Sequence, residues 1–415
     1  MSKKKKILVF CDTFLPPAYK PRVRYFCNYF VKKGYDLTLI TEYNSEQQLL
    51  NSNFPVYSID YYQFRNNILY RFEWFFKIIL NLFIPHKSII FYKKSKKILK
   101  NQNFDIVFCS ADFHSFPLTT AAMLAKKFNA QLFTDLRDIF EQSPDNKSFI
   151  ARQSNNLIYR LIVNFYKKIN TKRRNKVLKI SNCVTSVSNW HVKILTQFNI
   201  NTHLIYNGFD EDLFLPKIQK TDKFFISYFG EIYYEELRNP NILCAALKNL
   251  EKNGKISANN CCVKWFVNEN SKKIIQKIVE KHNIEDFVSY EKQVANEQYV
   301  LELNKNSILL VLCNSSNNKK YSGIMTTKFF EYIGVNRPIL CTPNNNDELA
   351  ETINAIGCGL VSSDVEEVEN FILKKYAEWQ QNGFTKGTVS AEIREKFSRK
   401  IGAEILENLF ENEEF

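Results

Sequence analysis

The chain has 415 residues, of which 45% are apolar and 24% charged, a composition typical of globular proteins and too long for one ordinary core. Lys and Arg exceed Asp and Glu by 14. Without zinc-finger spacing or an RNP-type motif, this charge predicts no nucleic-acid partner and leaves an anionic membrane surface, or simply Lys-rich composition, as its explanation. None of the ten Cys residues forms a Cys-x-x-Cys pair, which excludes the usual zinc and disulfide frameworks and favours a cytoplasmic protein.

The first half of the chain alternates between strand-like apolar runs and helical patterns, which predicts a parallel sheet covered on both faces. The run Ile7 to Phe10 is too short for a signal peptide and is expected to be the first strand. Further strands are predicted at 36–41, 105–109, 131–134, 183–187 and 203–205, and helices at 22–33, 117–128 and 189–198.

The loop after the first strand, Asp12 to Arg24, lacks a Gly-x-Gly-x-x-Gly pattern, which argues against a dehydrogenase. Arg22 and Arg24 stand at the start of a helix. They are expected either to hold a phosphate or an acidic acceptor, or to form an ordinary solvated first turn.

The segment Tyr61 to Lys97 mixes aromatic residues such as Trp74 with many cations, and it has no apolar stretch long enough to span a bilayer. Two interpretations remain open: an amphipathic segment that lies in the membrane interface, or a buried helix pair with a basic outer edge.

Polar side chains follow two neighbouring predicted strands. His114 lies in the loop after the strand that ends at Cys109, and Asp135, Arg137 and Asp138 follow the strand that ends near Thr134. Because ligands of such sheets bind at the carboxyl ends of the strands, these side chains are predicted to lie at a site.

A turn at Asn207–Gly208 precedes a second alternating pattern, so the domain boundary is expected between Asp210 and Asp222. Strands are predicted at 225–229, 263–267, 307–312 and 339–341, and helices at 241–250 and 396–415. Gly230 and Arg238 follow the first of these strands. Arg238 is the expected cation for an anionic ligand there, and Lys264 and Lys328 are the alternatives.

Gly323 precedes a helical pattern that carries Thr326, Thr327, Lys328 and Glu331. A helix start offers free N–H groups and a positive dipole end to an anion. Glu331 lies about 7 Å further along the helix axis, at roughly 1.5 Å per residue, and a carboxylate suits a ribose diol. The alternative is a simple ion pair between Lys328 and Glu331 on the helix surface.

These segments resemble the GT-B glycosyltransferases of family 4. Those enzymes carry two Glu seven residues apart, and here Glu331 matches the second while Gly323 stands in place of the first. His114 and the phrase Asp135-x-Arg137-Asp138 match the family's other motifs, with Ile139 where an aromatic residue is usual.

The resemblance implies two Rossmann-like, doubly wound α/β domains facing a central cleft: residues 1–210 on the acceptor side, joined by the C-terminal helix 396–415, and residues 211–395 holding the nucleotide sugar. It also implies retaining sugar transfer without a metal or other cofactor, in bacterial surface polysaccharide synthesis. The expected catalytic or positioning residues are His114, Asp135, Arg137 and Asp138. The donor-binding residues are Gly230, Arg238, Gly323, Thr326, Thr327, Lys328 and Glu331.

The expected partners are a nucleotide sugar, a glycan or polyprenyl-linked acceptor, and the inner face of the cell membrane. Two other functions stay open: a sugar-nucleotide epimerase of GT-B architecture, and a non-catalytic partner protein, which Gly323 would suit. The sugar, base, linkage and oligomeric state are not predicted.

Overall fold

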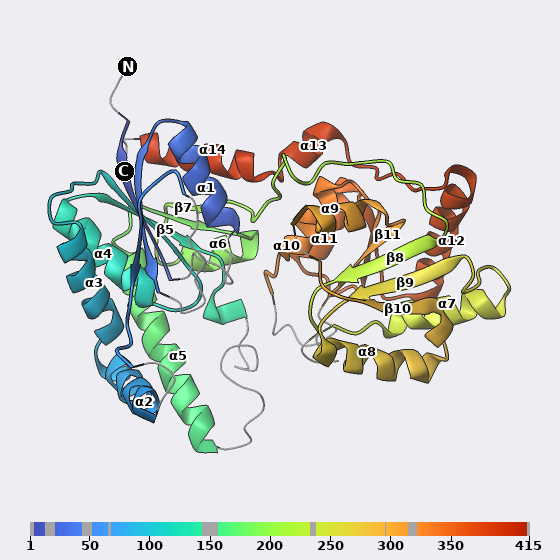
Figure 1. Ribbon diagram of the computed structural model, residues 1–415, viewed down its shortest axis with the longest axis horizontal. Coiled ribbons are helices and arrows are strands. Elements are labelled where there is room, and N and C mark those ends of the chain that lie inside the picture. The colour runs from blue at the N-terminus through green and yellow to red at the C-terminus, as the bar shows by residue number, and fades with distance from the viewer. Residues whose placement is uncertain are drawn as a thin grey trace. The chain divides into compact units, whose positions relative to one another are not determined.

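The computed structural model describes residues 4–12, 21–43, 52–64, 68–142, 157–232, 238–294, 296–313 and 322–412. The chain divides into two compact units. Unit 1 contains residues 1–206 together with 402–415, and unit 2 contains residues 207–401. Each unit is built around its own parallel sheet (Figure 1).

Within its described residues, unit 1 has a sheet of seven parallel strands in the order β3-β2-β1-β4-β5-β6-β7. Every residue of β4 is buried, and so is every residue of β1 after Lys6, as expected for apolar runs covered by helices on both faces. The strands are β1 (Lys6–Cys11), β2 (Asp36–Glu42), β3 (Val56–Ile59), β4 (Ile106–Ala111), β5 (Gln131–Leu136), β6 (Cys183–Ser186) and β7 (Thr202–Leu204).

Alternate residues of β1 enter two different cores. Leu8 and Phe10 pack in a cluster with residues of α3 (His86–Ile98) and α4 (Phe116–Phe128). Ile7 and Val9 point the other way, toward α1 (Pro21–Lys32) and the C-terminal helix α14 (Arg399–Glu411). The remaining helices of unit 1 are α2 (Ile68–Phe83), α5 (Leu157–Leu178) and α6 (Asn189–Leu195).

The return of the C-terminal helix to unit 1 is confirmed. Ala403, Leu406 and Phe410 of α14 are buried in the same core as β1 and α1. The Phe410 ring lies 4.7 Å from that of Phe133 on β5, in an edge-to-face arrangement.

Unit 2 repeats the architecture with six parallel strands in the order β10-β9-β8-β11-β12-β13. The strands are β8 (Phe224–Phe229), β9 (Cys261–Phe266), β10 (Val288–Glu291), β11 (Ile308–Leu312), β12 (Ile339–Thr342) and β13 (Gly359–Val361). The helices are α7 (Asn241–Lys252), α8 (Glu269–His282), α9 (Asn296–Asn304), α10 (Thr327–Gly334), α11 (Glu348–Ile356), α12 (Val365–Asn382) and α13 (Ala391–Glu395). Two doubly wound α/β units with this topology confirm the predicted GT-B fold class.

The topology of each sheet selects one place for a ligand. In unit 1 the chain winds outward from β1 to β3 and then returns to place β4 beside β1; in unit 2 it does the same from β8 to β10 before β11. Ligands of open parallel sheets bind beyond the strand carboxyl ends at such a reversal. A ligand is therefore expected next to the residues that follow β1, β4, β8 and β11.

Among the described residues, no single helix is long and apolar enough to cross a membrane. The pair α2 and α3 meets those criteria only when joined, and the two helices are bent by 98° relative to each other.

Candidate active site

A pocket of about 240 Å³ lies in unit 2 where β8 and β11 end and α10 begins. We call it the unit-2 pocket. It brings together five of the predicted donor-binding residues, Gly230, Arg238, Thr326, Thr327 and Lys328. Its other walls come from Tyr228, Phe229, Leu310, Val311, Leu312, Cys313, Ile324, Tyr332, Asn345 and Leu349.

Two cations line the unit-2 pocket. The Arg238 guanidinium is held in place because its Nη1 donates to the Glu231 carbonyl oxygen at 2.6 Å and to the Tyr228 hydroxyl at 3.2 Å. The Lys328 ammonium donates to the Tyr299 hydroxyl at 3.1 Å. Lys264, the other cation that the sequence offered, lies instead 3.6 Å from the ring centroid of Phe225 and does not line the pocket.

The start of α10 points its backbone at the same pocket. Thr326 precedes the helix in an extended conformation, with φ −63° and ψ 139°, and its side chain makes no capping hydrogen bond in the described structure. The Phe329 N–H donates to the Thr326 carbonyl oxygen at 3.2 Å. Among the described residues the N–H groups of Thr327 and Lys328 have no partner, so they can bind an anion in the pocket, where the helix dipole adds to the charge of Lys328.

Glu331 lies one turn into α10 beside the pocket rather than in its wall. Its Oε2 accepts from the Tyr299 hydroxyl at 2.7 Å and from Lys328 Nζ at 3.2 Å. The ion pair that the sequence offered as an alternative therefore exists. Both bonds use Oε2, and among the described residues Oε1 receives no recorded hydrogen bond, so the carboxylate retains an acceptor.

Gly323 adopts a left-handed backbone conformation with φ +72°, which favours glycine at this position. Its N–H is shared between the two carboxylate oxygens of Asp347, at 3.1 and 3.3 Å. Asp347 also caps α11 by accepting from the Glu348 N–H at 2.9 Å. Gly323 thus anchors the approach to α10 and does not itself line the pocket.

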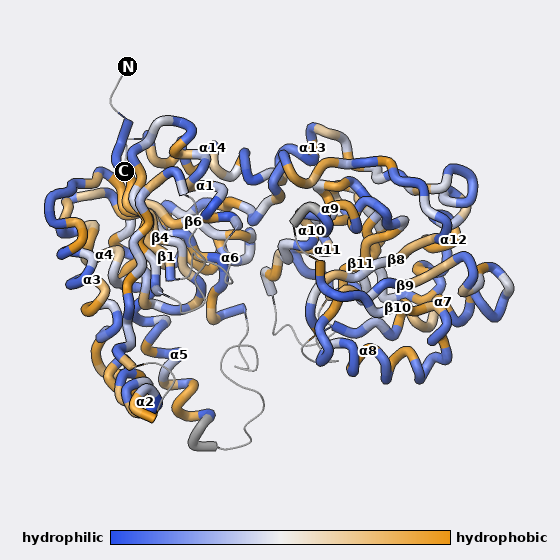
Figure 2. Tube along the Cα trace, viewed as in Figure 1, coloured by the Kyte–Doolittle hydropathy of each residue, from blue (hydrophilic) through white to orange (hydrophobic). Residues whose placement is uncertain are grey.

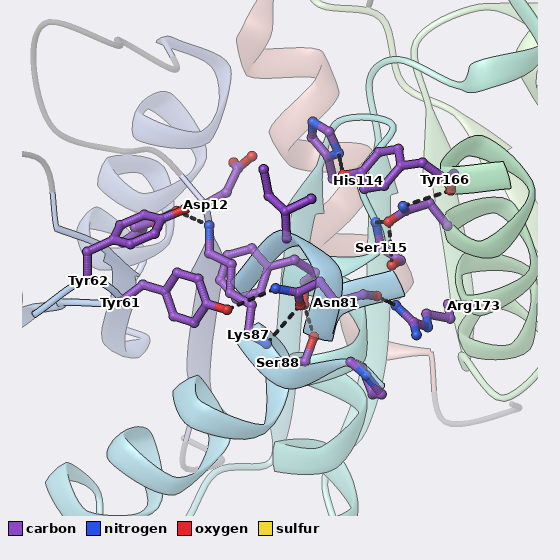
Figure 3. Close-up of a pocket in the computed structure, with 15 residues that line it drawn as sticks. Asp12, Tyr61, Tyr62, Asn81, Lys87, Ser88, His114, Ser115, Tyr166 and Arg173 are labelled. Carbon is purple, nitrogen blue, oxygen red and sulfur yellow. Dashed lines mark hydrogen bonds and ion pairs between the residues drawn. The ribbon is translucent and has the colours of Figure 1, made fainter. Parts of the chain in front are cut away.

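A second pocket, of about 300 Å³, lies in unit 1 beyond the carboxyl ends of β1, β2 and β4. We call it the unit-1 pocket. Figure 3 shows Tyr61 and Tyr62 on one side of it and His114 and Tyr166 on the other. The residues that line it are Asp12, Glu42, Tyr61, Tyr62, Ile78, Asn81, Pro85, Lys87, Ser88, His114, Ser115, Phe116, Tyr166, Asn170 and Arg173.

His114 is the only residue predicted as catalytic or acceptor-side that lines the unit-1 pocket among the described residues. Its Nδ1 lies 3.0 Å from the hydroxyl of Tyr166, which comes from α5. The imidazole also lies edge-on to the ring of Phe140, with centroids 6.4 Å apart. These contacts fix the ring at the pocket wall.

In the wall of the unit-1 pocket, Lys87 of α3 forms an ion pair with Glu42 at the end of β2, at 2.6 Å. The Lys87 ammonium also lies 4.3 Å from the ring centroid of Phe116. Burial raises the pKa of the Glu42 carboxyl, although Lys87 opposes that shift. A paired charge inside an aromatic pocket offers both a donor and an acceptor to a hydroxylated ligand.

The structure places Asp135 and Arg22 away from this surface. Arg22 Nη2 donates to Asp135 Oδ1 at 2.7 Å, and the two side chains are 2% and 0% exposed. Asp135 also accepts from Ser110 and Thr185, at 3.0 and 2.8 Å, and Arg22 donates to the Ile205 carbonyl oxygen at 2.5 Å. In this structure neither side chain reaches the pocket, Arg22 is not in the solvated first turn that the sequence left open, and the ion pair ties α1 to β5.

Arg137 and Asp138 follow β5 but do not line the pocket. Arg137 pairs with Asp112. Burial lowers the pKa of the guanidinium, but the carboxylates of Asp112, Asp138 and Asp135 together outweigh burial and raise that pKa. Asp138 accepts from Gln142 Nε2 at 3.0 Å, and Gln142 Oε1 lies 2.7 Å from Nε2 of the buried His191. Arg137 therefore takes part in an ion pair and Asp138 in a hydrogen-bond network, and neither side chain lines the unit-1 pocket.

Arg24, the other predicted acceptor-side residue, is half-buried on α1 and does not line either pocket. Most of the loop that the sequence singled out before it, residues 13–20, lies outside the described residues.

Sequence reasoning missed most of the unit-1 pocket. Lys87, Asn81, Tyr166 and Arg173 come from three helices, and no motif connects them in the sequence. Among the described residues, no three His, Cys, Asp or Glu side chains are arranged to hold a metal ion.

Comparison with known proteins agrees with this architecture. Residues 22–213 match the model of Glycosyltransferase Family 4. No curated protein sequence matches the chain.

Solved structures share the fold over nearly the whole length. Sucrose-phosphate synthase from Thermosynechococcus elongatus is 14% identical with a TM-score of 0.64, each chain being covered to 98%. HepE from Anabaena, solved with UDP, is 12% identical with a TM-score of 0.63 and coverage of 97% of this chain and 98% of HepE. The lipopolysaccharide outer core galactosyltransferase WaaB is 11% identical with a TM-score of 0.58 and the same coverage. The chain therefore has the GT-B fold, and residues 22–213, most of unit 1, are similar to Glycosyltransferase Family 4.

Proposed function

We propose that the protein transfers a sugar from a nucleotide-sugar donor to a glycan or lipid-linked acceptor, with retention of the anomeric configuration, in the synthesis of a bacterial surface polysaccharide. The observation that carries this proposal is the unit-2 pocket, in which Arg238, Lys328 and the start of α10 converge at the topological switch point. Helix N-termini and the cations of Arg and Lys are groups that bind phosphate oxygens in proteins, so the pocket suits a diphosphate.

In this proposal the donor diphosphate binds Arg238, Lys328 and the first N–H groups of α10, while Glu331 Oε1 accepts from the ribose diol. The Lys328–Glu331 and Tyr299–Glu331 hydrogen bonds hold the carboxylate in one orientation. HepE, which has the same fold, was solved with UDP, and this supports a nucleoside diphosphate as the ligand.

The chemistry follows from the charges. The bond between the anomeric carbon and the diphosphate oxygen breaks, and the nucleoside diphosphate leaves with the electron pair. A new bond forms to an acceptor hydroxyl oxygen, which loses its proton. The two cations and the helix dipole stabilise the charge that develops on the leaving group, so we propose that no metal or cofactor is needed.

We assign the acceptor to the unit-1 pocket, where His114 is held by Tyr166 and the Lys87–Glu42 pair offers a donor and an acceptor. His114 would position or polarise the sugar. Asp135, Arg137 and Asp138 would act indirectly, by fixing the ends of the strands and the loop after β5.

A panel of nucleotide sugars tests the proposal. Calorimetry should show one or a few donors that bind, and long incubation should show slow hydrolysis of the same donors. Release of the free sugar by water supports a transferase, whereas an isomerised nucleotide sugar would identify the epimerase. Binding with no turnover would identify a non-catalytic partner protein, and binding of no nucleotide at all would refute the assignment of the unit-2 pocket.

We further propose that the enzyme acts in the cytoplasm at the inner face of the cell membrane. The support is the strongly basic chain together with the aromatic and cationic segment 68–97, whose Arg65 end lies outside the described residues.

A further inference from the structure

Helix α2 is oriented opposite to an ordinary surface helix: its polar side faces the protein and its apolar side is exposed. Its polar residues Glu73, Lys77 and Asn81 recur every four positions and face the protein. Glu73 accepts from the Gln63 and Phe64 N–H groups at 3.0 Å. The Glu73 and Lys77 side chains, which form an ion pair, are only 10% and 14% exposed. Asn81 donates to the Tyr61 hydroxyl at 2.8 Å.

The opposite side of α2 is apolar and uncovered in the described structure. No residue of this helix is buried. Phe72, Phe76 and Phe83 are 69%, 61% and 74% exposed, and Ile68 and Phe75 lie on the same side by helical spacing. Isolated exposed apolar residues are ordinary, but a continuous stripe of large ones marks a surface that binds something apolar.

Helix α5 presents a second such face. Leu161, Phe165, Lys168, Lys172 and Lys176 follow one another at intervals of three or four residues, so they share one side of the helix. All five are exposed. The face is apolar in the first turns and cationic in the later ones. Figure 1 shows that α2 and the first turns of α5 project from the same end of unit 1, and Figure 2 shows apolar colouring on both.

The charge of these helices indicates which kind of partner covers the exposed faces of α2 and α5. In their described residues, helices α2, α3 and α5 together carry nine exposed Lys and Arg and no exposed carboxylate, whereas Lys77, Lys87 and Arg174 on the same helices are paired with Glu73, Glu42 and Glu141. A second copy of the chain would bring the same charge and be repelled. A bilayer with anionic headgroups meets both requirements, because its interior takes the aromatic side chains and its surface attracts the lysines.

We propose that the outer faces of α2 and α5 form a docking surface for an anionic bilayer, and that docking delivers a lipid-anchored acceptor to the unit-1 pocket. The second part rests on the proposed function. The inner sides of the same two helices wall that pocket, through Ile78 and Asn81 of α2 and Tyr166 and Arg173 of α5. Arg173 also donates to the Asn81 carbonyl oxygen at 2.5 Å, which couples the two helices. The polar head of an acceptor enters the pocket while its hydrocarbon chain stays in the bilayer.

Vesicle sedimentation tests the docking surface independently of catalysis. The full-length protein is mixed with phosphatidylcholine vesicles or with vesicles that also contain phosphatidylglycerol. It should bind the second kind and release at high salt, because salt screens the headgroup charge. Equal binding to both kinds of vesicle, or to neither, would overturn the proposal.

The lysines of α5 have a matched control on α8. Lys168, Lys172 and Lys176 are exposed at intervals of four, and so are Lys273, Lys277 and Lys281 in unit 2. Replacing either set by Gln removes the same charge. At roughly fivefold per lysine, the α5 triple variant should bind anionic vesicles on the order of 100-fold more weakly, and the α8 variant should bind nearly as wild type. Equal losses would reduce the effect to general charge.

The apolar part is tested by Phe72→Ser with Phe76→Ser, against Ile200→Ser with Ile218→Ser, two residues that are 90% and 67% exposed elsewhere. Only the α2 pair should weaken vesicle binding, and both proteins should keep the wild-type thermal unfolding temperature. Donor binding and donor hydrolysis in solution should be unchanged in every docking variant. Loss of vesicle binding with intact donor hydrolysis supports docking; intact vesicle binding in the α2 and α5 variants refutes it, whatever the enzyme does.

Discussion

Replacement of Glu331 by Ala is expected to weaken the binding of a nucleoside diphosphate by about 10- to 100-fold. The magnitude follows from the proposed contact of Oε1 with the ribose diol, since a hydrogen bond to a charged group contributes roughly 1.5–3 kcal/mol. The variant also removes the acceptor of the Tyr299 hydroxyl and of Lys328, so its folding is checked by thermal unfolding beside the nucleotide affinity.

Two control variants separate the ribose contact from its surroundings. Glu302 forms the same kind of i,i+3 ion pair with Lys305, at 2.6 Å, and its side chain is 17% exposed against 13% for Glu331. Glu302→Ala should therefore leave nucleotide affinity unchanged. Tyr299→Phe removes the 2.7 Å hydrogen bond to Glu331 but keeps the carboxylate, and it should cost less affinity than Glu331→Ala.

The decisive measurement is calorimetry with a ribonucleoside diphosphate, UDP being the first to try, and with its 2′-deoxy analogue. The wild-type protein should bind the deoxy analogue more weakly because one hydroxyl of the diol is missing. Glu331→Ala should bind both equally. If the variant still discriminates between them as the wild type does, the carboxylate does not hold the ribose and the reasoning fails.

The other predictions concern unit 1. His114→Ala should lower turnover by roughly 100-fold and leave donor affinity within twofold; equal losses in both would place His114 on the donor instead. His191 is buried and its pKa is lowered to about 4, below the usual value of about 6.5, so the unfolded chain binds more protons between these values and stability falls as the pH falls. Between pH 7 and pH 5 urea unfolding should show a loss of about 2 kcal/mol from this group, which His191→Gln should abolish. Arg22→Met leaves Asp135 charged and buried, and unfolding should lose about 3–5 kcal/mol; a loss below 1 kcal/mol would mean that the pair is not a structural anchor.

Sequence reasoning succeeded where one physical pattern dominates. The central strands β1, β4, β8 and β11 are short apolar runs, and their burial on both faces leaves little else for such runs to be. The edge strands β3, β10 and β13 were not predicted; they are three or four residues long and only partly buried, although the equally short edge strand β7 was predicted at 203–205. Helix α5 was also not predicted, since its exposed cations obscure the apolar periodicity.

The two pockets also differ in how much of each could be predicted from the sequence. Unit 2 builds its pocket largely from one continuous strand–loop–helix segment, so Thr326, Thr327 and Lys328 could be recognised together. Unit 1 builds its pocket from separate helices, and only His114 could be found from its place after a strand. Arg22 shows the limit most clearly. A basic residue in a first helical turn has the same sequence pattern whether it faces a phosphate or, as here, an internal carboxylate.

The two pockets occupy equivalent positions in similar sheets, yet their chemistry differs in a way that the fold alone does not dictate. In unit 2 the switch point is followed by a helix whose start is uncapped and flanked by Arg238 and Lys328, which suits a small, highly charged group. In unit 1 the pocket contains the ion pair of Glu42 with Lys87, and the Lys87 ammonium lies 4.3 Å from the ring centroid of Phe116. A neutral hydroxylated ligand loses little on entering such a site, because each of its hydroxyl groups can replace the water that the pair would otherwise hold. This difference in charge is the reason why we propose that the activated donor binds unit 2 and the acceptor binds unit 1.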